Sequence, residues 1–364
     1  MRIAITILIG IHGMIHLFGF FKAFGISEFN TISQPISKAS GIFWLLTFLF
    51  FLITLLLFLT HSNYWWLSGF LAAIISQLLI LNSWSDTKFG TIANVIILLA
   101  TLIGYSSFSF KNKIQEERIA LFENSQFKNQ EIVTEKALIH LPPIVQKWLI
   151  NSGTIGKQMI STVHLSQELQ LQLRPGQTSW SNGRAEQYFS IQPPAFNWNM
   201  DTKMNSILSI TARDKFEDGQ GEMIIKLLSL IPIADTKNDE KINQATLQRY
   251  LAEIVWFPSA SLGQHLTWET INDYSARATM EFMGTKGSGD FHFDKNGNFK
   301  KFMAMRYKDA SDAQPSEWTV TATKTEERNG IKIPVELKAD WKLGNGGHWT
   351  WLKLKVKNIE YNVK

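Results

Sequence analysis

Hydrophobic residues follow two different patterns along the chain. Residues 3–21, 42–60, 64–81 and 91–108 are long apolar stretches without a formal charge, each close to the ~20 residues that cross the core of a bilayer as a helix. After residue 137 apolar and polar residues alternate, which is typical of half-buried β-strands. We therefore expect a four-helix transmembrane domain at residues 1–110, with the lipid bilayer as its partner, and a β domain at residues 137–364.

Four crossings return the chain to the side of the membrane on which it began, so we expect both termini on one side of a bacterial plasma membrane. Basic residues near the spans number four on that side and three on the other: Arg2, Lys111, Lys113 and Arg118 against Lys22, Lys38 and Lys88. This excess of one favours a cytoplasmic β domain. The shape analogy given below favours the opposite orientation.

Residues 111–136 connect the two domains. This segment is rich in charge and carries a modest apolar stripe that includes Ile114, Leu121 and Phe122. It is compatible with a juxtamembrane helix and equally with a solvated linker.

The β domain is predicted to be a meander of ten or eleven antiparallel strands with helices near residues 142–152 and 242–257. Pro143 suits the first turn of the first helix, and Pro258 ends the second. Glycine-rich turns separate the later strands, as at residues 328–330 and 344–347. The fold class is thus an α + β membrane protein whose open or half barrel wraps one or two helices.

Polar side chains inside the apolar stretches mark a protein interior, since an imidazole facing lipid is costly. His12 and His16 lie four residues apart, on one face of the first helix. Gln77 and Asn94 are polar residues of the third and fourth stretches. The histidines are candidates for binding a metal, haem or quinone or for proton transfer. The alternative is that they pair with Gln77 and Asn94 and fix helix packing.

Candidate ligand-contacting residues of the β domain lie on its second helix and on two strands. Arg249 and Glu253 are four residues apart, opposite the apolar stripe of the helix, and form either a surface pair or, with Trp256, one wall of a cleft under the curled sheet. Trp198 and Trp341 are strand residues expected first of all in the core. Half of the strand side chains point inward, which is more apolar surface than two short helices fill, so an apolar ligand is the natural supplement.

Other chemistry has little support in the sequence. Asp290, His292 and Asp294 alternate along one strand face, a pattern open to metal binding but more typical of a solvated face, so we assign no metal site. The absence of cysteine excludes disulfides and thiol catalysis. Because HExxH, GxSxG and phosphate-loop patterns are missing, we assign no catalytic residue and no cofactor. Scattered lysines at a net charge of +5 do not indicate nucleic-acid binding.

Three segments of the β domain carry a resemblance to a bacterial family of unknown function: LPPIVQKWLINSGTIG, RYLAEIVWFP and ADWKLGNGGHWTWLKLKVKNIEYN. This resemblance covers roughly residues 137–364 and implies no activity or catalytic residue. The helical block, with its GIHGMIHLFGF start, is similar to the four-helix DoxX-like membrane domains. In shape, the meander resembles the half-barrels of lipoprotein carriers, in which a curved sheet encloses an apolar cleft.

These patterns lead to three hypotheses. The first is a membrane-anchored protein whose β domain binds or carries a lipid or acyl chain at the membrane surface. The second is a redox or proton-linked membrane enzyme built on His12 and His16. The third is a structural or partner-binding module. The sequence leaves the oligomeric state open.

Overall fold

The computed structural model describes residues 2–26, 33–125, 131–205, 208–344 and 346–363. The chain divides into two compact units. The first consists of Met1–Lys113 with Leu228–Leu230, and the second of Ile114–Leu227 with Ile231–Lys364. Below they are called the helical unit and the β unit.

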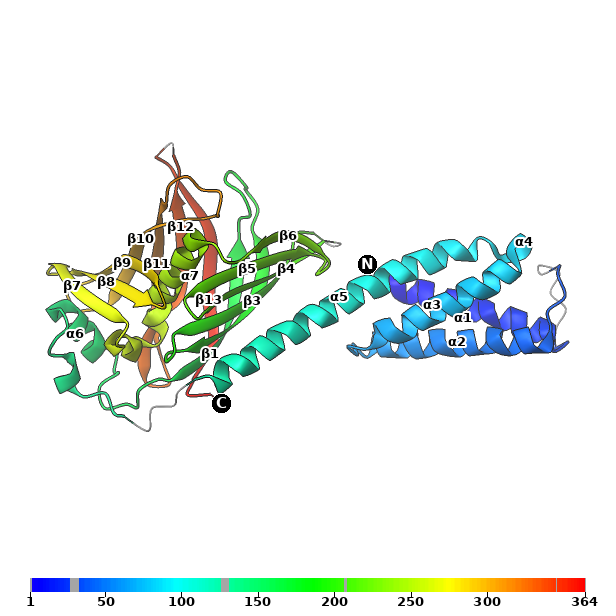
Figure 1. Ribbon diagram of the computed structural model, residues 1–364, viewed down its shortest axis with the longest axis horizontal. Helices are drawn as coiled ribbons and strands as arrows, with labels where there is room; N and C mark the ends of the chain where they lie inside the picture. The colour runs from blue at the N-terminus through cyan, green and yellow to red at the C-terminus, as the bar shows by residue number, and fades with distance from the viewer. Residues whose placement is uncertain (1, 27–32, 126–130, 206–207, 345, 364) are drawn as a thin grey trace. The chain divides into compact units, whose positions relative to one another are not determined.

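The helical unit contains four helices that are long and apolar enough to cross a membrane (Figure 1), as the hydropathy pattern predicted. They are α1 (Arg2–Ala23), α2 (Lys38–Leu59), α3 (Trp65–Asn82) and α5 (Gly90–Glu123), with the short α4 (Trp84–Thr87) before α5. The last turns of α5, from Ile114, belong to the β unit.

Small residues allow α1 and α2 to pack closely. A Cβ atom on Gly13 would lie 2.8 Å from the Cβ atom of Phe51, and one on Gly19 would lie 2.2 Å from Cδ2 of Trp44. Both distances are shorter than van der Waals contact, so only glycine fits at these positions. Such small-residue contacts replace the hydrophobic driving force that helices lack inside a bilayer.

The β unit is built on one antiparallel sheet of thirteen strands, in the order β6-β5-β4-β3-β2-β1-β13-β12-β11-β10-β9-β8-β7. Among the described residues β6 and β7 do not pair, so the sheet is open (Figure 1). The strands are β1 (Thr162–Leu171), β2 (Ser181–Ser190), β3 (Ala195–Lys203), β4 (Ser209–Glu217), β5 (Gln220–Leu227), β6 (Ile231–Thr236), β7 (Leu266–Asn272), β8 (Ser275–Phe282), β9 (Thr285–Phe293), β10 (Phe299–Arg306), β11 (Ser316–Arg328), β12 (Ile331–Lys342) and β13 (His348–Tyr361).

The predicted fold class, membrane helices followed by an open antiparallel sheet, is confirmed. The predicted number of strands, ten or eleven, is too low for the thirteen observed, and β6 is one strand that the pattern did not identify. This strand contains Pro232 and is only six residues long, and proline in a strand is tolerated at the edge of a sheet.

Helix α7 (Glu240–Glu253) lies inside the curve of the sheet and contacts β4, β5, β8, β9 and β10 (Figure 1). The Asp239 carboxylate caps its N-terminus by accepting hydrogen bonds from the backbone N–H groups of Lys241 and Ile242. Leu247 and Leu251 of its apolar stripe are fully buried.

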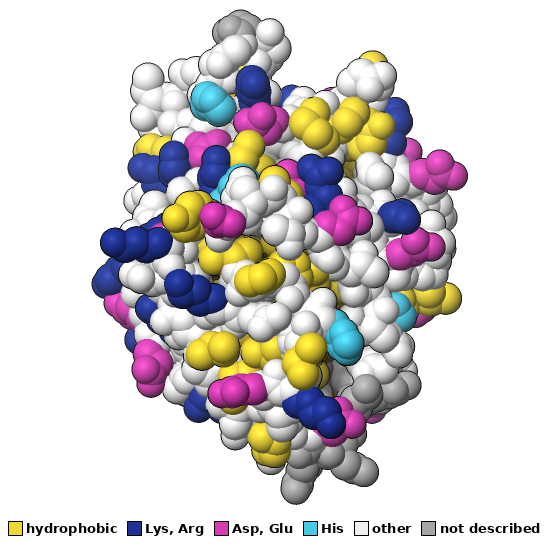
Figure 2. Space-filling view, turned by 90° about the vertical axis from the view of Figure 1, so that its left-hand side faces the viewer, with side chains coloured by type: hydrophobic (Ala, Val, Ile, Leu, Met, Phe, Trp, Pro, Cys, Tyr) yellow, Lys and Arg dark blue, Asp and Glu magenta, His cyan; other side chains and the backbone are white. Residues whose placement is uncertain are grey.

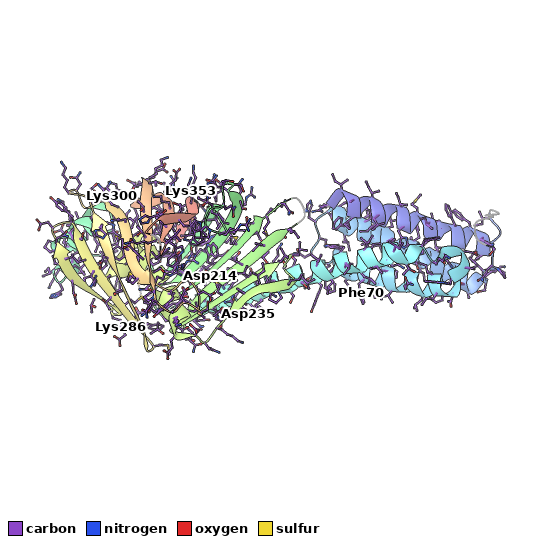
Figure 3. All side chains as sticks on the ribbon, turned by 90° about the horizontal axis from the view of Figure 1, so that it is seen from above. Phe70, Asp214, Asp235, Lys286, Lys300 and Lys353 are labelled. Atoms are coloured by element: carbon purple, nitrogen blue, oxygen red, sulfur yellow. The ribbon has the colours of Figure 1, made fainter. Side chains whose placement is uncertain are left out.

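Shorter helices complete the β unit: α6 (Pro143–Asn151) and the 3-10 turns η1 (Glu135–Leu138), η2 (Ile254–Trp256) and η3 (Pro258–Leu262). Figure 3 draws the described side chains of this unit on the ribbon. In that view Asp214 lies within the unit, whereas Lys286 and Lys300 lie at its periphery.

The last turns of α5 are held on the outer face of the sheet by a buried ion pair. Arg213 of β4 is fully buried, and its Nη2 atom lies 3.0 Å from Oε1 of Glu117 and 2.8 Å from Oε2 of Glu222. Asn197 of β3 donates a second hydrogen bond to Glu117, at 2.8 Å. Because Ala212 and Asp214 point to the inner face, alternation places Arg213 on the outer one.

A second polar cluster lies on the same outer face. The His164 ring of β1 lies 2.7 Å from Glu186 through Nε2 and 3.3 Å from Glu360 through Nδ1. It stacks on Tyr188, whose hydroxyl accepts a hydrogen bond from Arg118 of α5. The two carboxylates raise the pKa of His164, the hydrogen bond to Glu186 most of all.

We expect Glu117→Gln to lower the free energy of unfolding of the β unit by about 2 kcal/mol, less than complete loss of a buried ion pair because Glu222 remains. Urea denaturation of the detergent-solubilised protein, followed by tryptophan fluorescence, measures this. Glu281→Gln is the matched control, since Glu281 and Lys286 form an exposed pair and exposed pairs contribute little. Equal effects of the two substitutions would contradict the anchoring role of Glu117.

The His164 cluster predicts a pH dependence. A histidine whose pKa is raised on folding stabilises the folded state below its unfolded pKa of about 6.5, and this contribution disappears as the pH rises through the folded value. In NMR titration of ¹³C-histidine-labelled protein, His164 should titrate above His292, whose pKa is lowered chiefly by burial. Glu186→Gln should lower the pKa of His164 and bring it closer to that of His292. An unchanged pKa of His164 in this variant would contradict the role given to Glu186.

Candidate functional site

A pocket of about 510 Å³ lies between α7 and the inner face of the sheet, within the ~300–1,000 Å³ typical of small-molecule sites. Its walls come from strands on both sides of the β1–β13 pair and from α7 and η2. All five residues that the sequence suggested for a cleft line it: Trp198, Arg249, Glu253, Trp256 and Trp341.

Tryptophans form much of the pocket wall. They come from β3, η2, β11, β12 and β13 and are Trp198, Trp256, Trp318, Trp341, Trp349 and Trp351. Two indole N–H groups have acceptors: Trp198 donates to Gln167 at 2.9 Å and Trp256 to the Pro334 carbonyl at 3.0 Å. The indole N–H groups of the three tryptophans of β11 and β13 are buried without a partner among the described residues.

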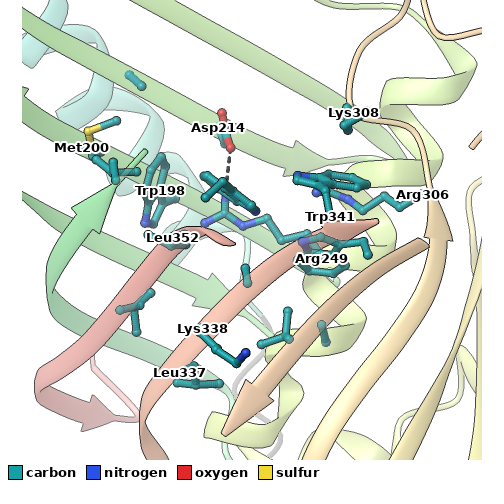
Figure 4. A pocket seen from close by; sticks show the side chains of 18 of the residues that line it. Trp198, Met200, Asp214, Arg249, Arg306, Lys308, Leu337, Lys338, Trp341 and Leu352 are labelled. Atoms are coloured by element: carbon teal, nitrogen blue, oxygen red, sulfur yellow. Dashed lines mark hydrogen bonds and ion pairs between the residues drawn. The ribbon is translucent and has the colours of Figure 1, made fainter. Parts of the chain in front are cut away.

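A half-buried ion cluster connects α7 to the sheet at one wall of the pocket. Arg249 Nη1 lies 2.6 Å from Asp214 of β4 (Figure 4). Arg249 Nε lies 2.9 Å from Glu253. Its guanidinium also lies 4.6 Å from the centroid of the Trp198 ring. Gln187 donates a 2.8 Å hydrogen bond to the other Glu253 oxygen. Burial raises the pKa of Glu253, and the ion pair with Arg249 opposes this rise.

A second arginine of the pocket, Arg306 of β10, has a different environment. Its Nε donates a 2.8 Å hydrogen bond to the carbonyl of Ala245, and its guanidinium carbon lies 4.6 Å from the centroid of the Trp318 ring. Within the described part of the chain, no carboxylate lies within 4.0 Å of it. Burial, with the nearby charge of Arg249 adding to it, lowers the pKa of Arg306 to about 10.

Arg306 and Asp214 were not identified as candidate residues in the sequence analysis. The sequence holds only part of the signal for Arg306: Phe302 and Ala304 alternate with it in one strand, and the structure adds that both are buried. A charged side chain that faces the interior of a protein is unusual and therefore marks a candidate site residue. Asp214 follows the same alternation after Ile210 and Ala212.

The intramembrane candidates form one hydrogen-bonded network within the helical unit. Asn94 donates to Gln77 at 3.0 Å, so its oxygen accepts from His12 Nε2 at 2.9 Å. His16 Nδ1 donates to the His12 carbonyl at 2.8 Å, which leaves its Nε2 to accept from the Ser76 hydroxyl at 2.9 Å.

With both imidazoles neutral, each of the hydrogen bonds named above has one donor and one acceptor. His12 Nε2 carries a hydrogen, and the lone pair of His16 Nε2 is occupied by Ser76. Gln77 in turn donates to Thr91 at 3.1 Å. The arrangement favours a polar packing seam between α1, α3 and α5 over a ligand set open to a metal or quinone.

Asp290, His292 and Asp294, which the sequence analysis considered for metal binding, each interact with a different partner. Asp290 pairs with Arg277 at 2.6 Å, His292 lies 2.8 Å from the Ser275 hydroxyl, and Asp294 accepts from Asn298. Throughout the described ranges, no group of three or more His, Cys, Asp or Glu side chains is placed to hold a metal ion. On the face drawn in Figure 2, acidic and basic side chains are interspersed among apolar ones.

The protein thus combines four helices that are long and apolar enough to cross a membrane with an open β half-barrel, whose inner face holds a pocket lined by aromatic residues. Residues 139–361, more than half of the chain, match a family of unknown function (DUF6920). The chain belongs to this family. No curated protein matches it. The similarity of the helices to DoxX-like domains stays a prediction.

We expect the double substitution His12→Phe and His16→Phe to lower the thermal stability of the helical unit, by about 0.6 kcal/mol for each interhelical hydrogen bond lost. The wild-type protein and the double variant should have the same visible absorption and metal content. Neither should show a haem or quinone band or a stoichiometric metal. Ser76→Ala is the control, because it removes the hydroxyl that pairs with His16 but leaves both imidazoles in place. A chromophore or metal present in the wild type and lost from the double variant would contradict the packing role.

Proposed function

We propose that this protein is a membrane-anchored binding protein whose β unit holds a lipid or acyl chain in the pocket beside α7. The observation that carries the proposal is the size and chemistry of that pocket, about 510 Å³ with six tryptophans among its lining residues. Apolar concave sites with a few placed polar groups are the usual form of ligand sites.

The energetics of the sheet support this proposal. Leu337, Leu352 and Leu354 also face the pocket, so water there contacts aliphatic and aromatic carbon. Each CH₂ group of a ligand that replaces this water gains about 0.8 kcal/mol. An acyl chain is therefore a better occupant than water or a polar metabolite.

The four apolar helices supply the second part of the proposal. A tether to the bilayer keeps the pocket near a reservoir of acyl chains, which raises their effective concentration at the site. We propose that the helices cross the bacterial plasma membrane, with both chain termini on one side. Hydrophobic ligands would then be bound without free diffusion through water.

The competing redox hypothesis has weaker support. It requires His12 and His16 to offer nitrogen atoms to a ligand, whereas both Nε2 atoms already take part in hydrogen bonds to Ser76 and Asn94. A purely structural role leaves the pocket without an explanation.

Lipid extraction and native mass spectrometry of the purified full-length protein test the proposal directly. We expect a bound lipid or acyl chain at near one per chain. Ile225→Trp should reduce its occupancy about tenfold or more, because Ile225 is a half-buried pocket residue of β5 and the indole fills space that the ligand needs.

Ile271→Trp is the matched control, since Ile271 of β7 is exposed and lies outside the pocket. It should retain wild-type occupancy. A wild-type protein free of lipid that also binds no added acyl chain, or equal losses in both variants, would overturn the proposal.

A further inference from the structure

We propose that the ligand is an amphiphile with an anionic head group, and that Arg306 and Lys308 bind this head group at one side of the pocket. The inference rests on the proposed function and adds the chemical class of the ligand. The shared chemistry is a terminal oxyanion, a carboxylate or a phosphate, on a long apolar chain.

The charges of the pocket lining are not balanced. Four cationic side chains line it, together with two carboxylates, those of Asp214 and Glu253. Both carboxylates are engaged by Arg249. Of the remaining cations, Lys338 lies 3.3 Å from Asp340, outside the lining. Arg306 and Lys308 have no carboxylate within ion-pair distance among the described residues.

The guanidinium of Arg306 is held in place, but part of its hydrogen-bonding capacity is unused. Its Nε atom donates a hydrogen bond to the Ala245 carbonyl. The centroids of the Trp318 and Trp341 rings lie 4.6 and 5.7 Å from its guanidinium carbon. The two Nη atoms make no hydrogen bond to another described residue. These atoms form the fork that binds carboxylate and phosphate groups in a bidentate manner.

Removing a guanidinium from water without a directly paired carboxylate is unfavourable. Burial lowers the pKa of Arg306 to about 10, and the more distant charges of Asp214 and Glu253 only partly oppose this shift. An anionic ligand would remove the penalty, which an uncharged lipid cannot do. Arg249 is in the opposite situation, because Asp214 and Glu253 already neutralise it. It is therefore a structural cation, and Arg306 is the one available to a ligand.

Lys308 extends the cationic side toward solvent. Its side chain is exposed, and its Nζ atom lies 5.7 Å from the centroid of the same Trp341 ring that Arg306 approaches. Figure 4 places Lys308, Arg306 and Trp341 on one side of the pocket, and Met200 and Trp198 on the other. This polarity matches a ligand with a charged head and an apolar tail.

Competition between lipids of equal chain length tests the inference. The full-length protein in a neutral detergent is stripped of lipid, incubated with equal amounts of oleate and oleyl alcohol, and analysed by native mass spectrometry. We expect oleate to be bound about tenfold or more in excess, since hydrogen bonds to a charged group are stronger than neutral ones. A parallel arm with oleoyl lysophosphatidate distinguishes a phosphate preference from a carboxylate preference.

Arg306→Gln should abolish the preference by lowering oleate binding to the level of the alcohol, while binding of the alcohol stays unchanged. Arg306→Lys keeps the charge without the fork and should retain part of the preference. Arg277→Gln, which removes an arginine of β8 that pairs with Asp290 outside the pocket, is the matched control. Alcohol binding also reports that each variant is folded.

The outcomes separate the two proposals. If the wild-type protein binds the alcohol and the two anionic lipids equally, the head-group inference is wrong and the binding function stands. The inference also fails if the preference for anions survives in Arg306→Gln. If no lipid binds, the proposed function itself is wrong.

Discussion

An open sheet that must cover its inner face with a single principal helix is the constraint on which the rest of this β unit depends. Antiparallel strands direct every second side chain inward, and thirteen of them create a larger apolar surface than α7 can cover. On one side of α7 the surface is closed by Leu247, Leu251 and the aromatic core. On the other it remains a pocket lined by tryptophan.

The polar groups of the pocket follow from the same constraint. Because α7 lies inside a curved sheet, Arg249 and Glu253, which would be surface residues on an exposed helix, are largely withdrawn from solvent, with 13% and 12% of their side chains exposed. Their charges are tolerated because Asp214 and Gln187 complete the hydrogen bonds, as buried ion pairs require. The cluster fixes the rotation of α7 and thereby the position of the pocket wall.

Sequence patterns predicted the architecture well because both of its signals are local. Apolar runs identified the four helices, and alternation identified most strands. Prediction failed where the outcome depends on tertiary context. The spacing of Arg249 and Glu253 favoured a surface pair over a cleft wall, and only the curvature of the sheet around α7 places both residues in the pocket lining. Arg306 was missed because one arginine in a strand is ordinary until its neighbours Phe302 and Ala304 prove to be buried.

The pairing of β1 with β13 has a consequence for how the chain acquires this fold. The two strands meet in the middle of the sheet, with Val163 opposite Tyr361, so contacts of very long sequence separation join its two halves. During synthesis, β1 to β6 can form local hairpins while β1 remains an unpaired edge until β13 emerges. Such topologies fold slowly and expose edges that favour aggregation. Earlier insertion of the helices would hold each nascent sheet apart from its neighbours during that interval.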